Sequence, residues 1–584
     1  MSRFLIIAYF CALLAACASQ SPVKEQVADS EVEPVPATEV PERAFPKDSL
    51  YALLVAEFAL RRQAYDVALD HYMEQAPILR DAGVSAHTTH LTQFLQREED
   101  ALEAAQLWVE LEPDDAEANN TLAELLARNG RTLEALSHFA VVEQQVGGAN
   151  FPIVLNGFER LNEDQRAQLA QGISQLISEY PENTLLLLTQ ALILTESEQY
   201  DEALDELHSL FKLEPEQPQA VLLEARILIA QQAKNPYKRI ERVLADNPDA
   251  TLLRLQYARL LTVTDMSAAE QQFEILSEQS PRDGDLLFSL ALINREIGDT
   301  EGARAYMQQV IALGQRVDEA YYYLGRMAEE EDQLEQAISN YMLVGESREY
   351  LPANNRIGQI LVMEGQLDRS HAWFDEQRDN YPQLRDQLLG LEAEILAEAG
   401  ATGEAMQILT QALAETPDSV ALRYGRAMLS EQQDDLASME KDLRTIIKAE
   451  PDNATALNAL GYTLANRTTR YTEAMELIST ALELQPGEPA ILDSMGWVMF
   501  RQGYYEEAVG YLTQAYARFP DPEVAAHLGE ALWKKGDFDA ALLVWQGAIL
   551  RDPDHPVLRS TLDRLGVDTL SQLPAQESPT ESIP

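Results

Sequence analysis

Apolar residues recur at helical spacing along most of the chain, in short amphipathic segments that come in pairs. The pattern is clearest between residues 451 and 553, where the same arrangement of small and apolar positions occurs three times. Gly461, Gly496 and Gly529 hold the same place in the three copies, at intervals of 35 and 33 residues. Alanines recur with the same period, and a proline closes each copy. The spacing predicts two helices per copy.

Physical reasons support this interpretation. The recurring small residues mark places where two helices cross closely, and a proline ends a helix because it lacks an N–H group and clashes with the preceding turn. Each helix pair leaves an apolar face that only a neighbouring pair can cover. A period of about 34 residues with these small positions resembles the tetratricopeptide repeat. We therefore expect an all-α fold, a superhelical solenoid of tetratricopeptide repeats.

The repeats extend over most of the chain, and we count about fourteen helix pairs. One stretch breaks the phase, because Gly147 and Gly148 precede Phe151 and Pro152 where the pattern requires a regular helix. The last amphipathic segment has a polar outer side, as the end of a repeat array requires. The expected boundaries are N-terminal repeats at 47–146, a degenerate pair at 147–183, the main array at 184–555, a capping helix at 556–567 and a disordered tail at 568–584.

The charge of the chain limits the classes of partner that it can bind. The 584 residues include 44 basic and 96 acidic side chains, a formal net charge of −52. Such a surface repels phosphate backbones, so nucleic acid is not an expected partner. It also disfavours adhesion to anionic lipid head groups, so any membrane attachment should depend on an anchor.

The N-terminus predicts such an anchor. Residues 1–16 have a basic start and an apolar run too short for a comfortable membrane span, which is typical of an export signal. The run ends in Leu14-Ala15-Ala16-Cys17, which resembles the lipobox of bacterial lipoproteins. That resemblance implies cleavage before Cys17 and acylation of this cysteine. Residues 17–46 are rich in Pro and Glu, and we expect a disordered tether that could span roughly 80–90 Å at about 3.1 Å per residue.

The cysteines and the residues after the lipobox extend this prediction. Cys11 would be removed with the signal, which leaves Cys17 alone and allows neither a disulfide nor a thiolate metal cluster. Ala18 and Ser19 follow in place of the aspartate that retains lipoproteins in the inner membrane of enteric bacteria. The resemblance therefore implies the inner leaflet of the outer membrane, with the body facing the periplasm.

Motifs for catalysis or cofactor binding are not found. The sequence has no glycine-rich phosphate loop, no GxSxG and no HExxH. The eight histidines are scattered, and His87 and His90 have no partners that complete a metal site. We expect neither an enzyme nor a cofactor.

What remains is surface for binding proteins. In a tetratricopeptide array the first helix of each pair lines the concave side. Aromatic and arginine side chains there are favoured anchors of protein interfaces, although the aromatic rings could equally pack between repeats. The candidate residues are Asn458, Tyr462, Asn466, Asp493, Trp497, Phe500, Arg501, Glu530, Trp533 and Lys534.

The amino-acid sequence of the last hundred residues gives a more specific resemblance. The segments LNALGYTLANR, PAILDSMGWVMFRQG and PEVAAHLGEALWKKGD look like a group of proteobacterial tetratricopeptide outer-membrane lipoproteins. One branch of that group is the adaptor of a periplasmic carboxyl-terminal processing protease and delivers cell-wall hydrolases to it. The resemblance implies a non-catalytic scaffold that controls peptidoglycan turnover. The alternative is an assembly factor for an envelope machine, such as a pilus secretin or the outer-membrane biogenesis machinery.

Overall fold

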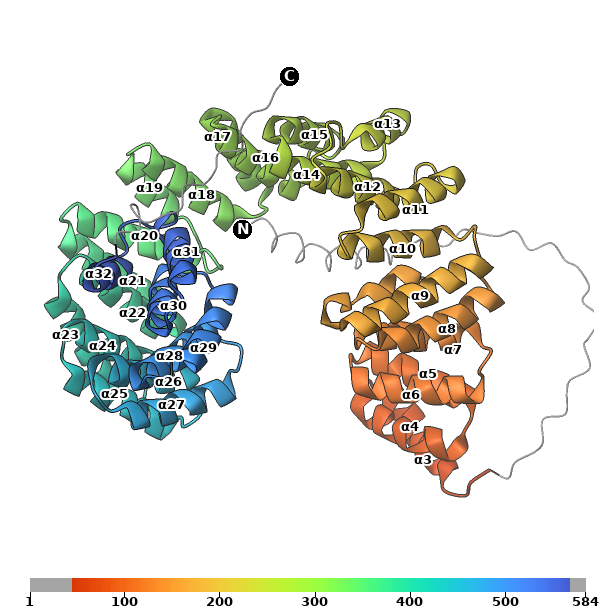
Figure 1. The fold of residues 1–584 in the computed structure, drawn as a ribbon, viewed down its shortest axis with the longest axis horizontal. Helices are drawn as coiled ribbons and strands as arrows, with labels where there is room; N and C mark the ends of the chain where they lie inside the picture. Colours follow the sequence, from red (N-terminus) through yellow and green to blue (C-terminus); the bar gives the residue numbers. More distant parts are fainter. Residues whose placement is uncertain (1–44, 568–584) are drawn as a thin grey trace, which may run out of the picture. The chain divides into compact units, whose positions relative to one another are not determined.

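The computed structural model describes residues 45–567, and these residues form helices joined by short turns (Figure 1). The predicted signal, Cys17, almost all of the tether and the tail at 568–584 lie outside the described residues. The chain divides into two compact units after Pro281, and each unit is a stack of helix pairs. The predicted all-α repeat fold is confirmed, with fourteen α-helix pairs in the described part.

The first unit ends at Pro281 and contains six of the pairs and one irregular pair. Its helices are α3 (Ser49–Arg61), α4 (Tyr65–Leu79), α5 (Ala82–Phe94), α6 (Glu98–Leu111), α7 (Ala116–Arg128), α8 (Thr132–Gln145), the 3-10 turns η1 (Phe151–Leu155) and η2 (Phe158–Arg160), α9 (Glu163–Glu179), α10 (Thr184–Glu196), α11 (Tyr200–Leu213), α12 (Pro218–Ala230), α13 (Lys238–Asp246), α14 (Thr251–Thr264) and α15 (Met266–Gln279).

The second unit begins at Arg282 and contains eight pairs and a final single helix. Its helices are α16 (Gly284–Ile297), α17 (Thr300–Leu313), α18 (Val317–Glu330), α19 (Leu334–Tyr341), α20 (Tyr350–Met363), α21 (Leu367–Asn380), the 3-10 turn η3 (Pro382–Leu384), α22 (Arg385–Glu398), α23 (Thr402–Glu415), α24 (Val420–Gln432), α25 (Leu436–Ala449), α26 (Ala454–Arg467), α27 (Tyr471–Leu484), α28 (Pro489–Gln502), α29 (Tyr505–Arg518), α30 (Pro522–Lys535), α31 (Phe538–Ile549) and α32 (Pro556–Leu565).

Local signals fix where many helices begin and end. Asn453 and Asp521 precede α26 and α30, and each side chain accepts a hydrogen bond from a backbone N–H of the first turn. Such caps satisfy donors that have no partner within the helix. Gly503 and Gly536 follow α28 and α30 with φ of 90° and 99°, a left-handed conformation that glycine adopts without strain.

The predicted role of the recurring glycines is confirmed. A Cβ atom at Gly496 would lie 2.5 Å from Leu512 Cγ and 3.1 Å from the carbonyl oxygen of Ala508, both on the second helix of the same pair. A Cβ atom at Gly529 would lie 2.1 Å from Nε1 of Trp545. These glycines therefore set how closely the two helices of a pair approach.

Replacing Gly496 with leucine should destabilise the C-terminal repeats by roughly 1–3 kcal/mol, because the added side chain overpacks the helix crossing. Thermal unfolding followed by circular dichroism measures the effect. Gly510→Leu is the matched control, because Gly510 is exposed on α29 and a Cβ atom there meets nothing within 4 Å. Equal melting curves for the two variants would contradict the assigned crossing.

The stretch expected to be a degenerate pair is irregular in its first half only. The turns η1 and η2 stand in place of a first helix, and α9 is a regular second helix. Pro152 lies at the start of η1, and Gly157 adopts φ of 82°, so neither supports a continuous α-helix. Phe151 and Phe158 are nevertheless buried and keep the hydrophobic core continuous through this region.

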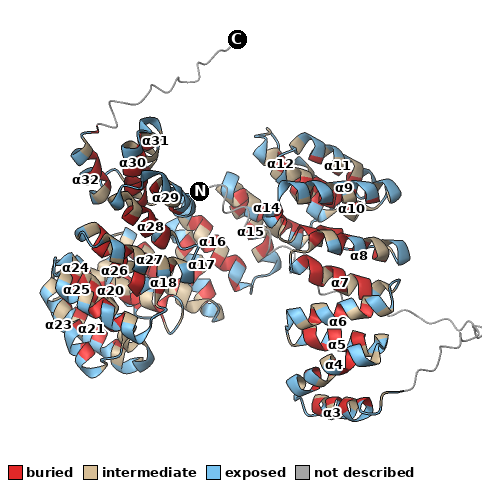
Figure 2. Cartoon of the chain, turned by 60° about the horizontal axis from the view of Figure 1, so that its bottom comes forward, coloured by how far each residue is buried: buried red, intermediate tan, exposed pale blue. Residues whose placement is uncertain are grey.

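The two ends of the described chain differ. At the C-terminal end α32 buries Leu558 and Leu562 and exposes a polar side, which confirms the predicted capping helix. At the other end α3 exposes Leu50, Leu54 and Phe58, although its opposite side is buried (Figure 2). None of the described helices is both long and apolar enough to cross a bilayer.

Candidate functional site

In the second unit α20 contacts α22, α22 contacts α24, and α28 contacts both α26 and α30, whereas no two successive second helices there are in comparable contact. The first helices therefore line the inner side of the stack, as the repeat pattern predicts. Near the C-terminus α26, α28, α30 and α32 together enclose a pocket of about 330 Å³. We call it the C-terminal pocket; its lining residues are Tyr462, Asn466, Trp497, Glu523, His527, Pro556, Val557, Ser560, Thr561 and Arg564.

A buried ion pair lies beside this pocket. Nδ1 of His527 donates to both carboxylate oxygens of Asp493 at 3.0 Å, and both side chains are buried. Burial disfavours the imidazolium, but the Asp493 carboxylate, assisted by Glu523 and Glu530, raises the pKa of His527 above its ordinary value. The pair joins α28 to α30 and so connects two neighbouring repeats.

Stacked rings form one wall of the pocket. The Trp497 ring lies 4.1 Å from the His527 ring and 4.9 Å from the Phe500 ring, nearly parallel to both. Nε1 of Trp497 donates to Oδ1 of Asn466 at 3.2 Å. With only 7% of its surface exposed, Trp497 mainly packs between repeats and shapes the pocket wall.

Two further polar contacts span the repeats. The Tyr462 hydroxyl donates to Oε1 of Glu523 at 2.8 Å, which joins α26 to α30 across α28. Burial and the charge of Glu523 raise the pKa of Tyr462, so this hydroxyl stays protonated. Arg564 of α32 donates two hydrogen bonds to the buried Glu530, at 2.7 and 2.5 Å, and so fastens the capping helix to the last pair.

The remaining predicted residues are distributed around this network. Arg501 donates to the Asn466 carbonyl at 2.8 Å and to the Tyr471 hydroxyl at 3.1 Å. Trp533 turns towards Phe538 and Trp545 and does not line the pocket. Of the last two candidate residues, Asn458 is half-buried and Lys534 is exposed.

The structure thus brings Tyr462, Asn466 and Trp497 together at one pocket and places Asp493 and Glu530 beneath it. Whether the ten candidates bind a partner stays a prediction.

The sequence interpretation missed His527, Glu523 and Arg564. A usable signal was present, since Asp493 and His527 are 34 residues apart, as are Glu530 and Arg564. Opposite charges one repeat period apart fall at the same position of successive first helices, where they can meet.

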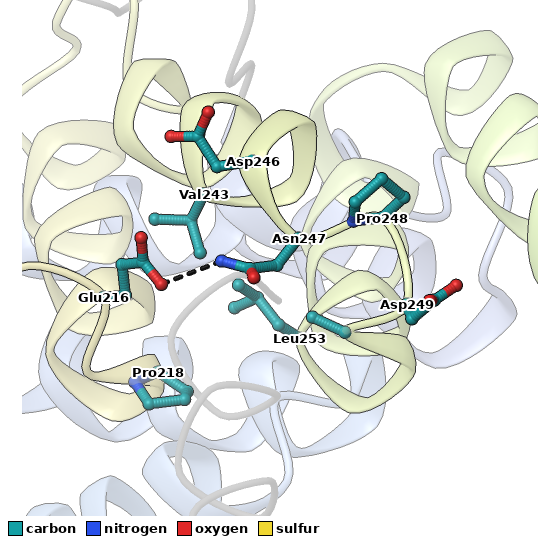
Figure 3. Close-up of a pocket in the computed structure, with 9 residues that line it drawn as sticks. Glu216, Pro218, Val243, Asp246, Asn247, Pro248, Asp249 and Leu253 are labelled. Carbon is teal, nitrogen blue, oxygen red and sulfur yellow. Dashed lines mark hydrogen bonds between the residues drawn. The ribbon is translucent and has the colours of Figure 1, made fainter.

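A second cavity lies in the first unit, at the turns around α13 (Figure 3). Its volume is about 500 Å³, and Asn247 donates to Glu216 across it at 2.8 Å. Its lining combines carboxylates with proline and aliphatic side chains and holds no nucleophile paired with a base. Across residues 45–567, no three His, Cys, Asp or Glu side chains are grouped as a metal site would require.

Comparisons with known proteins agree with this architecture. A family model described as tetratricopeptide repeat matches residues 259–315, 295–345, 440–489 and 495–556. A TPR repeat-containing protein of Pseudomonas aeruginosa is 38% identical over 533 residues, which cover 90% of each chain. The chain belongs to this family of tetratricopeptide-repeat proteins. The fold of the family is typical of non-catalytic proteins that bind other proteins.

Two further similarities are more distant. The CTR9 homolog of Arabidopsis thaliana is 25% identical over 206 residues, which cover 34% of this chain and 19% of that protein. Among solved structures, yeast Tom70 matches 88% of this chain and 99% of its own at 16% identity, with a TM-score of 0.31.

Proposed function

We propose that this tetratricopeptide-repeat protein is a non-catalytic adaptor that binds a periplasmic carboxyl-terminal processing protease and its cell-wall hydrolase substrates. The observation that carries the proposal is the C-terminal pocket, where aromatic and charged side chains from four helices form a surface suited to a polypeptide. The resemblance of the last hundred residues to protease-adaptor lipoproteins supplies the class of partner. By holding protease and substrate together, the adaptor raises their effective concentration and promotes proteolysis.

An adaptor needs at least two binding surfaces. The exposed apolar side of α3 in the first unit is a second candidate, separate in sequence from the C-terminal pocket. Five large apolar residues between Phe45 and Phe58 are exposed, the densest such group in the described chain. This distribution supports a scaffold with one surface in each unit.

The direct test combines the purified full-length protein with the protease and a murein endopeptidase from the same organism. We expect faster cleavage of the endopeptidase when the protein is added, and recovery of the protease with it from envelope extract. Unchanged cleavage, with secretin or barrel-assembly components recovered instead, would reject the adaptor role in favour of an envelope assembly factor.

We also propose that acylated Cys17 anchors the protein in the inner leaflet of the outer membrane, facing the periplasm. Several acyl chains give lasting attachment, whereas one chain alone is marginal. Cys17→Ala should therefore move the protein from the membrane fraction to the soluble fraction, as measured by immunoblotting. Cys11→Ala is the matched control and should leave the protein in the membrane. Membrane pelleting of the Cys17→Ala variant would contradict the anchor.

A further inference from the structure

One carboxylate at the C-terminal pocket lacks a cationic partner. Asp493 is paired with His527 and Glu530 with Arg564, but Glu523 forms no ion pair with a lysine or arginine among the described residues. Its only hydrogen-bond donor from another side chain there is the Tyr462 hydroxyl. Among the Asp493, Glu523 and Glu530 carboxylates, Glu523 is therefore the one with no cation beside it.

Glu523 occupies a place in the helix that suits a negatively charged side chain. It lies in the first turn of α30, where the helix dipole favours a negative charge. It is half-buried and lines the pocket, so a ligand can reach it. Less water screens the carboxylate there than at the open surface. The attraction between Glu523 and a bound cation is therefore stronger.

The other pocket residues suit the stem of a long basic side chain. The Tyr462 ring, Pro556 and Val557 present apolar surface beside the carboxylate. Lysine and arginine place methylene groups against apolar surface while the charged end stays with a polar partner. The face of an aromatic ring adds attraction for the cation. At about 330 Å³, the pocket has room for a side chain and its adjoining backbone, and it is too small for a folded domain.

We propose that the C-terminal pocket binds a lysine or arginine side chain of a partner polypeptide, with Glu523 as its counter-ion. The proposal rests on the proposed function, in which the partners are proteins, and it adds the chemistry of the segment they present. The overall charge of −52 acts in the same direction, since it attracts a basic segment over longer distances.

Fluorescence anisotropy with a labelled Gly/Ser peptide that carries one lysine tests the proposal on the full-length protein. We expect the peptide to bind, and Glu523→Gln to weaken its affinity about tenfold, the size of one hydrogen bond to a charged group. Glutamine can still accept the Tyr462 hydrogen bond, so the pocket should keep its shape. Glu507→Gln removes the same charge from an exposed site on α29 and should leave the affinity unchanged.

Three results would overturn the proposal. The first is equal binding of a peptide with glutamine in place of lysine. The second is an equal loss of affinity in the Glu507→Gln and Glu523→Gln variants, which would indicate general charge attraction only. The third is preferred binding of a glutamate peptide, which would assign the recognition to Arg564. Stimulation of the protease is a separate measurement. The adaptor role can therefore hold when the pocket does not bind a basic side chain, and the pocket can bind one when the adaptor role fails.

Discussion

Replacing Asp493 with alanine is expected to destabilise the last three repeats by roughly 3–5 kcal/mol, because it leaves His527 buried without its counter-ion. The imidazole is buried and stacked on the Trp497 ring, so water solvates it poorly once the carboxylate is removed. The loss should be confined to the second unit, where α28 and α30 pack together.

Hydrogen exchange suits this measurement, since a repeat array can open locally without unfolding as a whole. Backbone amides of α28 and α30 should exchange faster in Asp493→Ala, while those of α16 and α17 keep their protection. Asp563→Ala is the matched control, because Asp563 is exposed on the outer side of α32. Similar exchange in both variants would show that the buried pair contributes no stability.

The pair should also make stability depend on pH. The pKa of His527 is higher in the folded protein than in the unfolded chain, where it is about 6.5. The ion pair therefore stabilises the fold fully below the unfolded pKa, and this stabilisation is lost as the pH rises through the folded pKa. The groups that face it are Asp493, Glu523 and Glu530, the last already paired with Arg564, and the neutral Tyr462. The difference in the free energy of unfolding between wild type and Asp493→Ala should therefore become smaller above neutral pH.

The fold could be predicted because its determinants are local and periodic. Gly496 and Leu512 lie within one repeat, so their contact follows from the spacing inside a single helix pair. The same holds for the prolines and capping residues at the ends of many helices. The irregular turn at Phe151 could be located from Gly147, Gly148 and Pro152, although its 3-10 geometry could not.

The site was harder to predict because it depends on contacts between repeats. Trp497 occupies a position that faces the inner side, yet the rings on both sides of it bury it. Tyr462 reaches Glu523 two repeats further along the chain, a contact that depends on how successive pairs rotate about the stack. A single repeat carries no information on that rotation.

The largest packing effect is expected from Trp545→Ala, at about 3–5 kcal/mol, because Trp545 is fully buried and its removal leaves a cavity in the last pair. The tryptophan packs directly over Gly529, where a Cβ atom would lie 2.1 Å from its Nε1. Its N–H has no acceptor among the described residues, so Trp545→Phe removes an unpaired donor together with part of the ring. That control should therefore lose less stability than Trp545→Ala.

A double-mutant cycle makes the test specific to this crossing. Gly529→Ala alone should be destabilising, since the new methyl group clashes with the indole ring. In the Trp545→Ala background the same methyl group enters the space that the indole ring has left, so Gly529→Ala should lose less stability there. The double variant should therefore be more stable than the sum of the two single losses predicts. Thermal unfolding of the four proteins measures the coupling. Strict additivity would mean that the two residues do not meet, and the repeat phase assigned to the last pair would then be wrong.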